Sequence, residues 1–199
     1  MRGVIISGGN VGEYIKDYIT PDDFIICADS GYDHAKRFGI TPNIVIGDMD
    51  STQFSDILEE KILYPVRKDF TDSELCIMYA EEKGFESTLL FGMTGTRMDH
   101  TLANLLMLKR LKNARIIDAN NEIYYVEGEF SIKGKVGDII SIIPISEDLL
   151  GVTTKGLDYP LKDAQVKYGK SLGVSNVMVD TECVIKIEKG AAFIIRSKD

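Results

Sequence analysis

Three short acidic motifs hold the residues of this chain that are best suited to chemistry. They are Gly47-Asp48-Met49-Asp50-Ser51, Lys68-Asp69-Phe70-Thr71-Asp72 and Arg97-Met98-Asp99-His100. Two carboxylates about 4 Å apart repel by roughly 4 kcal/mol at an effective dielectric near 20, so a fold that gathers several Asp side chains needs a cation or shared protons. The natural candidate is Mg²⁺, which prefers oxygen ligands and usually keeps waters and phosphate oxygens in its shell.

The first motif follows an apolar run, Ile44 to Ile46, that predicts a buried strand. In an extended chain Asp48 and Asp50 lie about 6.6 Å apart and project to the same side. Open α/β folds place their chemistry outside the carboxyl ends of strands, which is where this pair falls. A solvated turn with two capping carboxylates is an equally good explanation of this motif alone.

The second motif has a simpler explanation beside the functional one. Thr71 and Glu74 have the spacing of a capping box, and Asp72 in a first helical turn suits the helix dipole. Two other acidic strand ends are expected nearby, however, and they favour a shared site.

The third motif follows a glycine-containing loop, Gly92 to Thr96, and opens a predicted helix. Backbone N–H groups at a helix start bind phosphate, and Arg97 adds a forked donor. His100 and Asn104 share a helix face. Asp99 as a helix N-cap is the alternative. A phosphate-binding loop beside carboxylates predicts an enzyme that acts on an Mg²⁺–nucleotide complex.

These motifs lie in the first part of the chain, and the sequence pattern changes near residue 122. Before that point strand-like runs alternate with helical segments, which predicts an α/β fold, an α/β/α layer structure with a mostly parallel sheet. After it, short β-rich runs with turn residues predict a smaller antiparallel sandwich or barrel, and we take the sandwich as the expectation. We therefore expect two domains, residues 1–121 and residues 122–199.

The clearest predicted helix runs from Asp99 to Leu111. An apolar stripe at near-helical spacing is formed by Leu102, Leu105 and Leu106, followed by Leu108 and Leu111, and we expect this stripe to belong to the hydrophobic core.

The composition narrows the classes of partner. The formal net charge of the 199-residue chain is -8, so a nucleic-acid partner is not expected. No stretch approaches the length of a membrane span. The three cysteines lie far apart in apolar runs, which predicts buried thiols in a reducing compartment, and we expect a cytoplasmic protein.

Taken in order, the motifs resemble those of the thiamine pyrophosphokinase family. The resemblance is carried by short islands, most distinctively by Gly-Asp-x-Asp-Ser and Asp-x-x-Thr-Asp in tandem. The islands are Ala28-Asp29-Ser30-Gly31, Gly47-Asp48-Met49-Asp50-Ser51, Lys68-Asp69-Phe70-Thr71-Asp72, Gly95-Thr96-Arg97-Met98-Asp99-His100 with Asn104, Gly156-Leu157-Asp158-Tyr159-Pro160-Leu161 and Gly173-Val174-Ser175-Asn176.

The resemblance implies a reaction and a set of roles. The β,γ-diphosphoryl group of ATP is transferred to the hydroxyl of thiamine, giving thiamine diphosphate and AMP. The α/β part supplies the Mg²⁺–ATP site, the β-rich part binds thiamine, and two identical subunits complete the site between them. By motif position, the catalytic carboxylates are Asp48, Asp50, Asp72 and Asp99, with the first three as metal ligands; Asp29, Ser30, Arg97, His100 and Asn104 bind nucleotide; and Tyr159, Ser175 and Asn176 bind thiamine.

Thiamine carries a positive charge and a flat pyrimidine, so it suits a negative pocket with an aromatic face. The animal and fungal members place Trp where Tyr159 stands, and this chain has no Trp. Tyr159 either stacks on thiamine, contacts the second subunit, or packs at a strand edge. Two other functions stay open from the sequence: a metal-dependent phosphoesterase, and a regulatory module that binds thiamine or a nucleotide.

Overall fold

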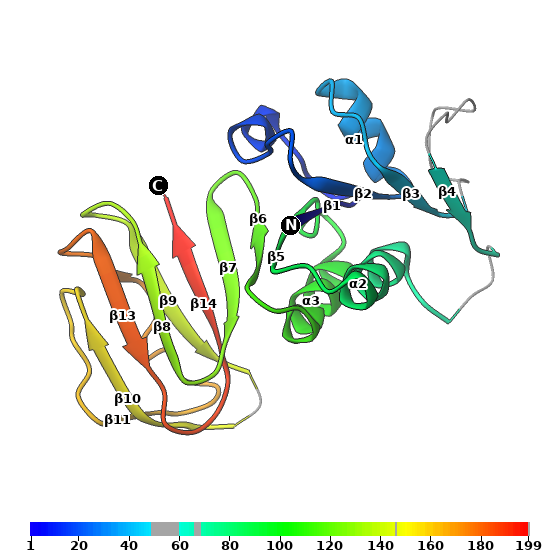
Figure 1. Ribbon diagram of the computed structural model, residues 1–199. Helices are drawn as coiled ribbons and strands as arrows, with labels where there is room; N and C mark the ends of the chain where they lie inside the picture. The colour runs from blue at the N-terminus through cyan, green and yellow to red at the C-terminus, as the bar shows by residue number, and fades with distance from the viewer. Residues whose placement is uncertain (49–59, 66–68, 146, 199) are drawn as a thin grey trace. The chain divides into compact units, whose positions relative to one another are not determined.

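The computed structural model describes residues 1–48, 60–65, 69–145 and 147–198. It divides into two compact units, residues 1–119 and residues 120–199. The predicted α/β class is confirmed: a large, mostly parallel sheet is accompanied by separate antiparallel pairing (Figure 1). Of the described helices, none is long and apolar enough to cross a membrane.

The strands of the first unit run parallel in the order β6-β5-β1-β2-β3-β4. Their bounds are β1 Arg2–Ile6, β2 Phe24–Ala28, β3 Ile44–Gly47, β4 Glu60–Leu63, β5 Ser87–Phe91 and β6 Ala114–Ile117. The central strands are apolar on both faces because helices cover both sides, as is typical of parallel sheets. The sequence did not predict β4, because this mostly exposed edge strand is half charged and has no apolar run.

Within the described residues, three α-helices and two short 3₁₀ helices join these strands. They are η1 Glu13–Asp17, α1 Gly31–Arg37, α2 Asp72–Lys83, α3 Met98–Met107 and η2 Leu108–Arg110. Figure 1 shows α1 on one face of the sheet and α2 and α3 on the other. Side chains along β1 alternate between the two faces of the sheet. Val4 and Ile6 join the core beneath α1 and η1, whereas Ile5 lies on the face that α2 contacts.

The predicted cap of α2 is present in part. The backbone N–H of Glu74 donates to Thr71 Oγ1 at 3.1 Å, as the capping box requires. The Glu74 carboxylate instead pairs with Arg110 at 3.3 Å. The helix ends at Gly84, whose positive φ of 66° is the usual left-handed cap.

The predicted leucine stripe belongs to the core only in part: Leu108 is buried, whereas Leu102 and Leu106 are exposed, and for these two the prediction was wrong. Met98, Leu102 and Leu106 are 62%, 55% and 52% exposed, and Asn104 is the buried residue of the helix. The stripe does follow the helical period. It lies on the side of α3 that faces away from the residues lining the cleft described below. The amphipathic spacing therefore identified an apolar helix face, but it does not indicate what covers that face.

The second unit contains two antiparallel sheets, with strand orders β12-β9-β14-β7 and β11-β10-β13-β8. The bounds are β7 Asn121–Val126, β8 Glu129–Lys133, β9 Ile139–Pro144, β10 Leu149–Lys155, β11 Ala164–Val166, β12 Asn176–Val177, β13 Glu182–Lys186 and β14 Ala192–Ser197. Alternate residues of both sheets share one hydrophobic core, which includes Ile140, Val152, Cys183 and Ile194. All three cysteines are buried, as expected.

Candidate active site

A cleft of about 440 Å³ opens at the carboxyl ends of the parallel strands of the first unit. This is the edge at which open α/β sheets bind ligands. The cleft takes residues from the ends of β1, β2, β3 and β5 and from the first turns of α2 and α3. The lining residues used below are Ser7, Gly8, Gly9, Asn10, Asp29, Ser30, Asp48, Asp72, Ser73, Met93, Thr94, Gly95, Arg97, His100, Thr101 and Asn104.

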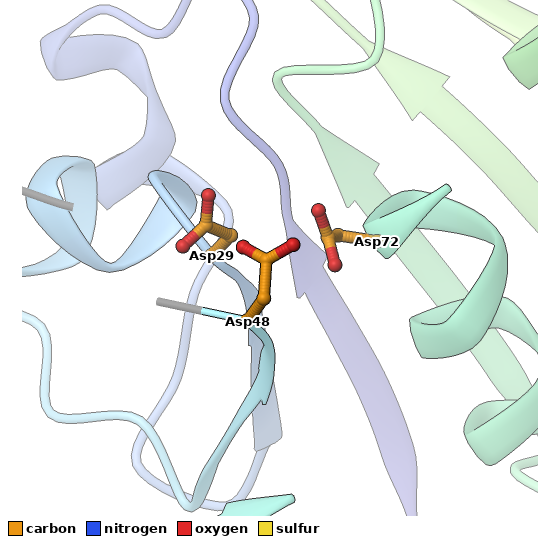
Figure 2. A group of neighbouring side chains, drawn as sticks. All are labelled: Asp29, Asp48 and Asp72. Carbon is orange, nitrogen blue, oxygen red and sulfur yellow. The ribbon is translucent and has the colours of Figure 1, made fainter. Parts of the chain in front are cut away.

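Three carboxylates converge in this cleft. Asp29 follows β2, Asp48 follows β3, and Asp72 opens α2; one oxygen from each lies within 4.8 Å of the others. Figure 2 shows the three side chains as neighbours. Asp29 is 4% exposed, and the other two are half-buried. Such an all-oxygen donor set suits a hard divalent cation that also takes phosphate oxygens and water.

The backbone at Asp29 is shaped for this position. Its φ is 41°, a left-handed conformation that Asp adopts more readily than most residues. The turn is held on both sides: the Asp29 N–H donates to the carbonyl of Ile46 at 3.0 Å, and the N–H of Tyr32 donates to the Asp29 carbonyl at 2.9 Å. Uncommon backbone conformations of this kind gather at functional sites.

Two glycine-containing loops form another wall of the cleft. The N–H of Gly9 donates to the carbonyl of Gly92 at 2.8 Å, and the N–H of Asn10 donates to that of Thr94 at 2.8 Å. A Cβ on Gly9 would lie 2.3 Å from the Thr94 carbonyl oxygen, so only glycine allows this approach. Nε2 of His34 on α1 lies 2.9 Å from the Gly9 carbonyl oxygen and holds the first loop from behind.

The second loop is held by the helix that follows it. Asn104 Nδ2 donates to the Met93 carbonyl at 2.8 Å. Thr101 Oγ1 accepts from the N–H of Gly95 at 3.2 Å and lies 3.2 Å from the Arg97 carbonyl. The loop that presents Arg97 is therefore fixed by the buried side of α3.

Arg97 and Asp99 form a two-point ion pair at the cleft mouth. Arg97 Nε donates to Asp99 Oδ1 at 3.0 Å, and Nη2 donates to Oδ2 at 2.5 Å. The hydrogen bonds from Arg97 hold the pKa of Asp99 well below its usual range and raise that of the guanidinium. Among the described residues, Arg97 lines the cleft and Asp99 does not.

The structure thus brings together most of the residues expected at the nucleotide site: Asp29, Ser30, Asp48, Asp72, Arg97, His100 and Asn104 line one cleft. Asp50 lies outside the described residues. Asp99 is exposed and bound to Arg97, apart from the three carboxylates.

Two parts of the cleft lining were not predicted from the sequence, and a third residue was given too small a role. Gly8 to Asn10 and Ser73 line the cleft, and Asp29 belongs to the carboxylate cluster rather than to its surroundings. The signal for the first was present, because Gly8-Gly9-Asn10 follows the strand β1 as Asp48 follows β3. The strand-end rule applied to every strand would have found it.

The residues expected to bind thiamine lie together in the second unit. Asn176 Oδ1 accepts from the N–H of Tyr159 at 3.1 Å, and Nδ2 donates to the Tyr159 carbonyl at 2.7 Å. Ser175 has a φ of 59°, and its N–H donates to Ser141 Oγ at 3.1 Å. The amide of Asn176 is thus used largely to hold the turn of Tyr159, a residue that is 76% exposed.

A parallel α/β unit with clustered carboxylates, two glycine loops and an arginine at its strand ends is typical of proteins that act on phosphate groups. Residues 15–118 match the family description "Thiamin pyrophosphokinase, catalytic domain", and residues 129–192 match "Thiamin pyrophosphokinase, vitamin B1 binding domain". The chain belongs to the thiamine pyrophosphokinase family, as its motifs led us to expect.

Individual relatives agree with this assignment. The chain is 34% identical to thiamine pyrophosphokinase of Bacillus subtilis, over 98% of each chain. The crystal structure of thiamine pyrophosphokinase from that organism superposes with a TM-score of 0.91 at 28% identity and full coverage of both chains. That of the Geobacillus thermodenitrificans enzyme gives 0.89 at 26% identity, covering all of this chain and 98% of the other. Neither the phosphoesterase nor the regulatory module is supported.

Proposed function

We propose that the chain transfers the β,γ-diphosphoryl group of ATP to the hydroxyl of thiamine, with Mg²⁺ held by Asp29, Asp48 and Asp72. The observation that carries this proposal is the convergence of these three carboxylates within 4.8 Å in a cleft walled by glycine loops. The oxygen-only donor set fits Mg²⁺. When bound, Mg²⁺ would neutralise phosphate charge and orient the phosphate chain. Asp50 stays a proposed further ligand.

The chain's own residues would do the positioning. The N–H groups and glycines of the two loops offer the phosphates a close approach, and Arg97 supplies a forked cationic donor. His100 and Ser30 line the same cleft and are proposed to contact the nucleotide. Asn104 acts through the loop that it holds. Because diphosphoryl transfer needs an in-line approach of the alcohol to the β-phosphorus, this positioning supplies much of the catalysis.

The proton of the thiamine hydroxyl needs an acceptor. Asp99 is a poor one, because its pKa lies well below its usual range through the hydrogen bonds from Arg97. We propose that a carboxylate of the cluster, or Asp50, receives the proton. Asp99 then acts as the group that orients Arg97.

We propose that residues 1–121 form the catalytic Mg²⁺–ATP domain and residues 122–199 a thiamine-binding sandwich. In the second, the exposed ring of Tyr159 offers a face for stacking on the cationic thiamine, with Ser175 beside it. The supporting observation is the clamp of Asn176 on the backbone of Tyr159, which fixes the turn that carries the ring.

We further propose a cytoplasmic homodimer. Met98, Leu102 and Leu106 form an exposed apolar stripe on α3, a face that a second copy of the chain would cover. The burial of all three cysteines, far apart in the sequence, fits a reducing compartment.

Product analysis tests the reaction. The purified chain incubated with ATP, Mg²⁺ and thiamine should form AMP and thiamine diphosphate in equal amounts. Asp48→Asn should abolish both products, whereas Asp17→Asn, an exposed carboxylate on η1, should change neither. Formation of ADP as the sole nucleotide product, or of inorganic phosphate without a thiamine product, would rule the proposal out.

A further inference from the structure

Two buried serines join the end of β1 to the first turn of α2. The hydroxyl oxygens of Ser7 and Ser73 lie 2.5 Å apart and share a hydrogen bond, although the residues are 66 positions apart in the chain. Their residues are 6% and 9% exposed. Both border the cleft, and Ser73 directly follows Asp72.

The two ends of this contact differ in how firmly they are held. Ser7 continues β1, which pairs with β2 on one side and β5 on the other, and its N–H donates to the Phe91 carbonyl at 2.9 Å. Ser73 belongs to a helix that packs on the sheet through side chains. The serine pair is thus a polar tie between a fixed strand end and a helix end.

The position of this helix end determines the geometry of the carboxylate cluster. Asp29 and Asp48 follow β2 and β3, which are hydrogen-bonded to each other. Asp72 comes from α2, so its distance from the other two depends on how closely the helix start approaches the sheet. Charge repulsion among three carboxylates within 4.8 Å favours a larger separation.

A hydroxyl pair allows a closer approach than apolar side chains do. Oxygen atoms that share a hydrogen bond lie 2.5 Å apart here, whereas non-bonded carbon atoms prefer about 3.5–4.0 Å. Two buried hydroxyls are not needed for stability, because replacing both partners of a hydrogen bond by apolar groups can be nearly neutral. The close approach of the helix start to the strand end therefore explains why serines occupy these two positions, whereas stability alone does not.

We propose that Ser7 and Ser73 are positioning residues whose hydrogen bond holds Asp72 at metal-binding distance from Asp29 and Asp48. This inference rests on the proposed metal site. It assigns the pair no contact with the reacting groups, so its effect should be visible in metal binding without nucleotide or thiamine.

The test compares Ser7→Ala, Ser73→Ala and the double variant by two measurements. The first is Mn²⁺ affinity, measured from the electron spin resonance signal of the free ion in the absence of nucleotide. The second is thermal unfolding in metal-free buffer. Each single variant should lose stability, because it leaves one buried hydroxyl without its partner.

The double variant separates positioning from structural support. Its unfolding temperature should return toward that of the wild type, while its Mn²⁺ affinity should stay roughly three- to tenfold weaker, the size of one hydrogen bond. Ser197→Ala is a matched control, since Ser197 also donates a side-chain hydrogen bond, to Asn121 at 2.8 Å in the second unit. It should leave Mn²⁺ binding unchanged.

Mn²⁺ affinity at the wild-type level in the double variant would overturn the positioning role. Asp48→Asn distinguishes this failure from failure of the site. If Asp48→Asn loses Mn²⁺ while the double serine variant keeps it, only the role of the serines is wrong. If Asp48→Asn binds Mn²⁺ like the wild type, or the wild type binds none, the metal site is wrong and the serine inference falls with it.

Discussion

Gly47 lies so close to Asp72 that a Cβ at position 47 would stand 3.1 Å from Asp72 Oδ1. The same Cβ would stand 3.0 Å from Cβ of Asp29, and φ at Gly47 is 155°. The missing side chain is therefore what lets two carboxylates from different elements approach the end of β3.

Gly47→Ala should weaken Mn²⁺ binding and destabilise the fold, because the new methyl group crowds two proposed ligands. We expect the free energy of unfolding to fall by about 1–3 kcal/mol, the usual cost of an unfavourable backbone conformation. Gly39→Ala is the matched control: its φ is 70°, and nothing lies within 4 Å of its added Cβ. It should lose stability but keep Mn²⁺ affinity. Equal Mn²⁺ affinity in Gly47→Ala and the wild type would contradict the crowding argument.

Asp72→Asn should make the metal-free protein more stable. Removing one of three converging charges relieves repulsion, and we expect a gain of about 1 kcal/mol in urea unfolding with chelator present. Mg²⁺ should raise the unfolding temperature of the wild type but not of the variant.

Glu74→Gln is the control for loss of a charge in the same first turn of α2, since Glu74 lies outside the cluster and pairs with Arg110. It should lose a little stability and keep the response to Mg²⁺. A loss of metal-free stability in Asp72→Asn would show that repulsion does not dominate at this site.

Asp99→Asn should impair ATP binding more than the chemical step. The amide cannot hold Arg97 by the two charge-assisted hydrogen bonds that the carboxylate accepts, so we expect KM for Mg²⁺–ATP to rise roughly five- to tenfold. The pH dependence of kcat should keep its shape. A fall in kcat by several orders of magnitude, with an altered acid limb, would instead identify Asp99 as the proton acceptor.

The sequence predicted the helices and strands more fully than the contacts that their residues make. Asp29 and Asp48 could be placed at one site because both follow parallel strands, whose carboxyl ends meet at one edge of a sheet. The membership of Asp29 in the carboxylate cluster and the contact that Ser73 makes could not be predicted in the same way. Their roles depend on a left-handed turn and on a contact between residues 66 positions apart, and neither leaves a periodic signal.

The sequence also could not show what covers an apolar helix face. The spacing of Leu102 and Leu106 correctly indicated an apolar helix face, yet periodicity is the same whether a core or another molecule covers that face. The strand β4 was missed for the opposite reason, since an edge strand can do without an apolar run.

Asp23 should make the stability of the first unit depend on pH. Burial opposes ionisation of this side chain, but hydrogen bonds from Arg2 and Thr20 outweigh it and lower its pKa. A lowered folded-state pKa stabilises the protein above the unfolded value of about 3.9, and this stability is lost as the pH falls below it. Asp23→Asn should therefore cost about 2 kcal/mol at pH 7 and much less near pH 3.

Urea unfolding at both pH values measures this difference. Asp17→Asn, which removes an exposed carboxylate nearby in the chain, should show no such change between the two conditions. If the cost of Asp23→Asn is the same at pH 3 as at pH 7, packing rather than charge accounts for it.

The double variant Leu102→Glu/Leu106→Glu should convert the proposed dimer to a monomer. The two side chains follow each other at i and i+4 on the exposed face of α3, so the change places two carboxylates on each copy of an apolar contact, where burying unpaired charge is costly. Sedimentation velocity at micromolar concentration should show a dimer for the wild type and a monomer for the variant. Val136→Glu, which adds a carboxylate at another exposed apolar residue, should leave the dimer intact. A dimer that persists in the double variant would place the interface elsewhere, and Tyr159→Ser, the exposed aromatic residue of the second unit, would then be measured in the same way.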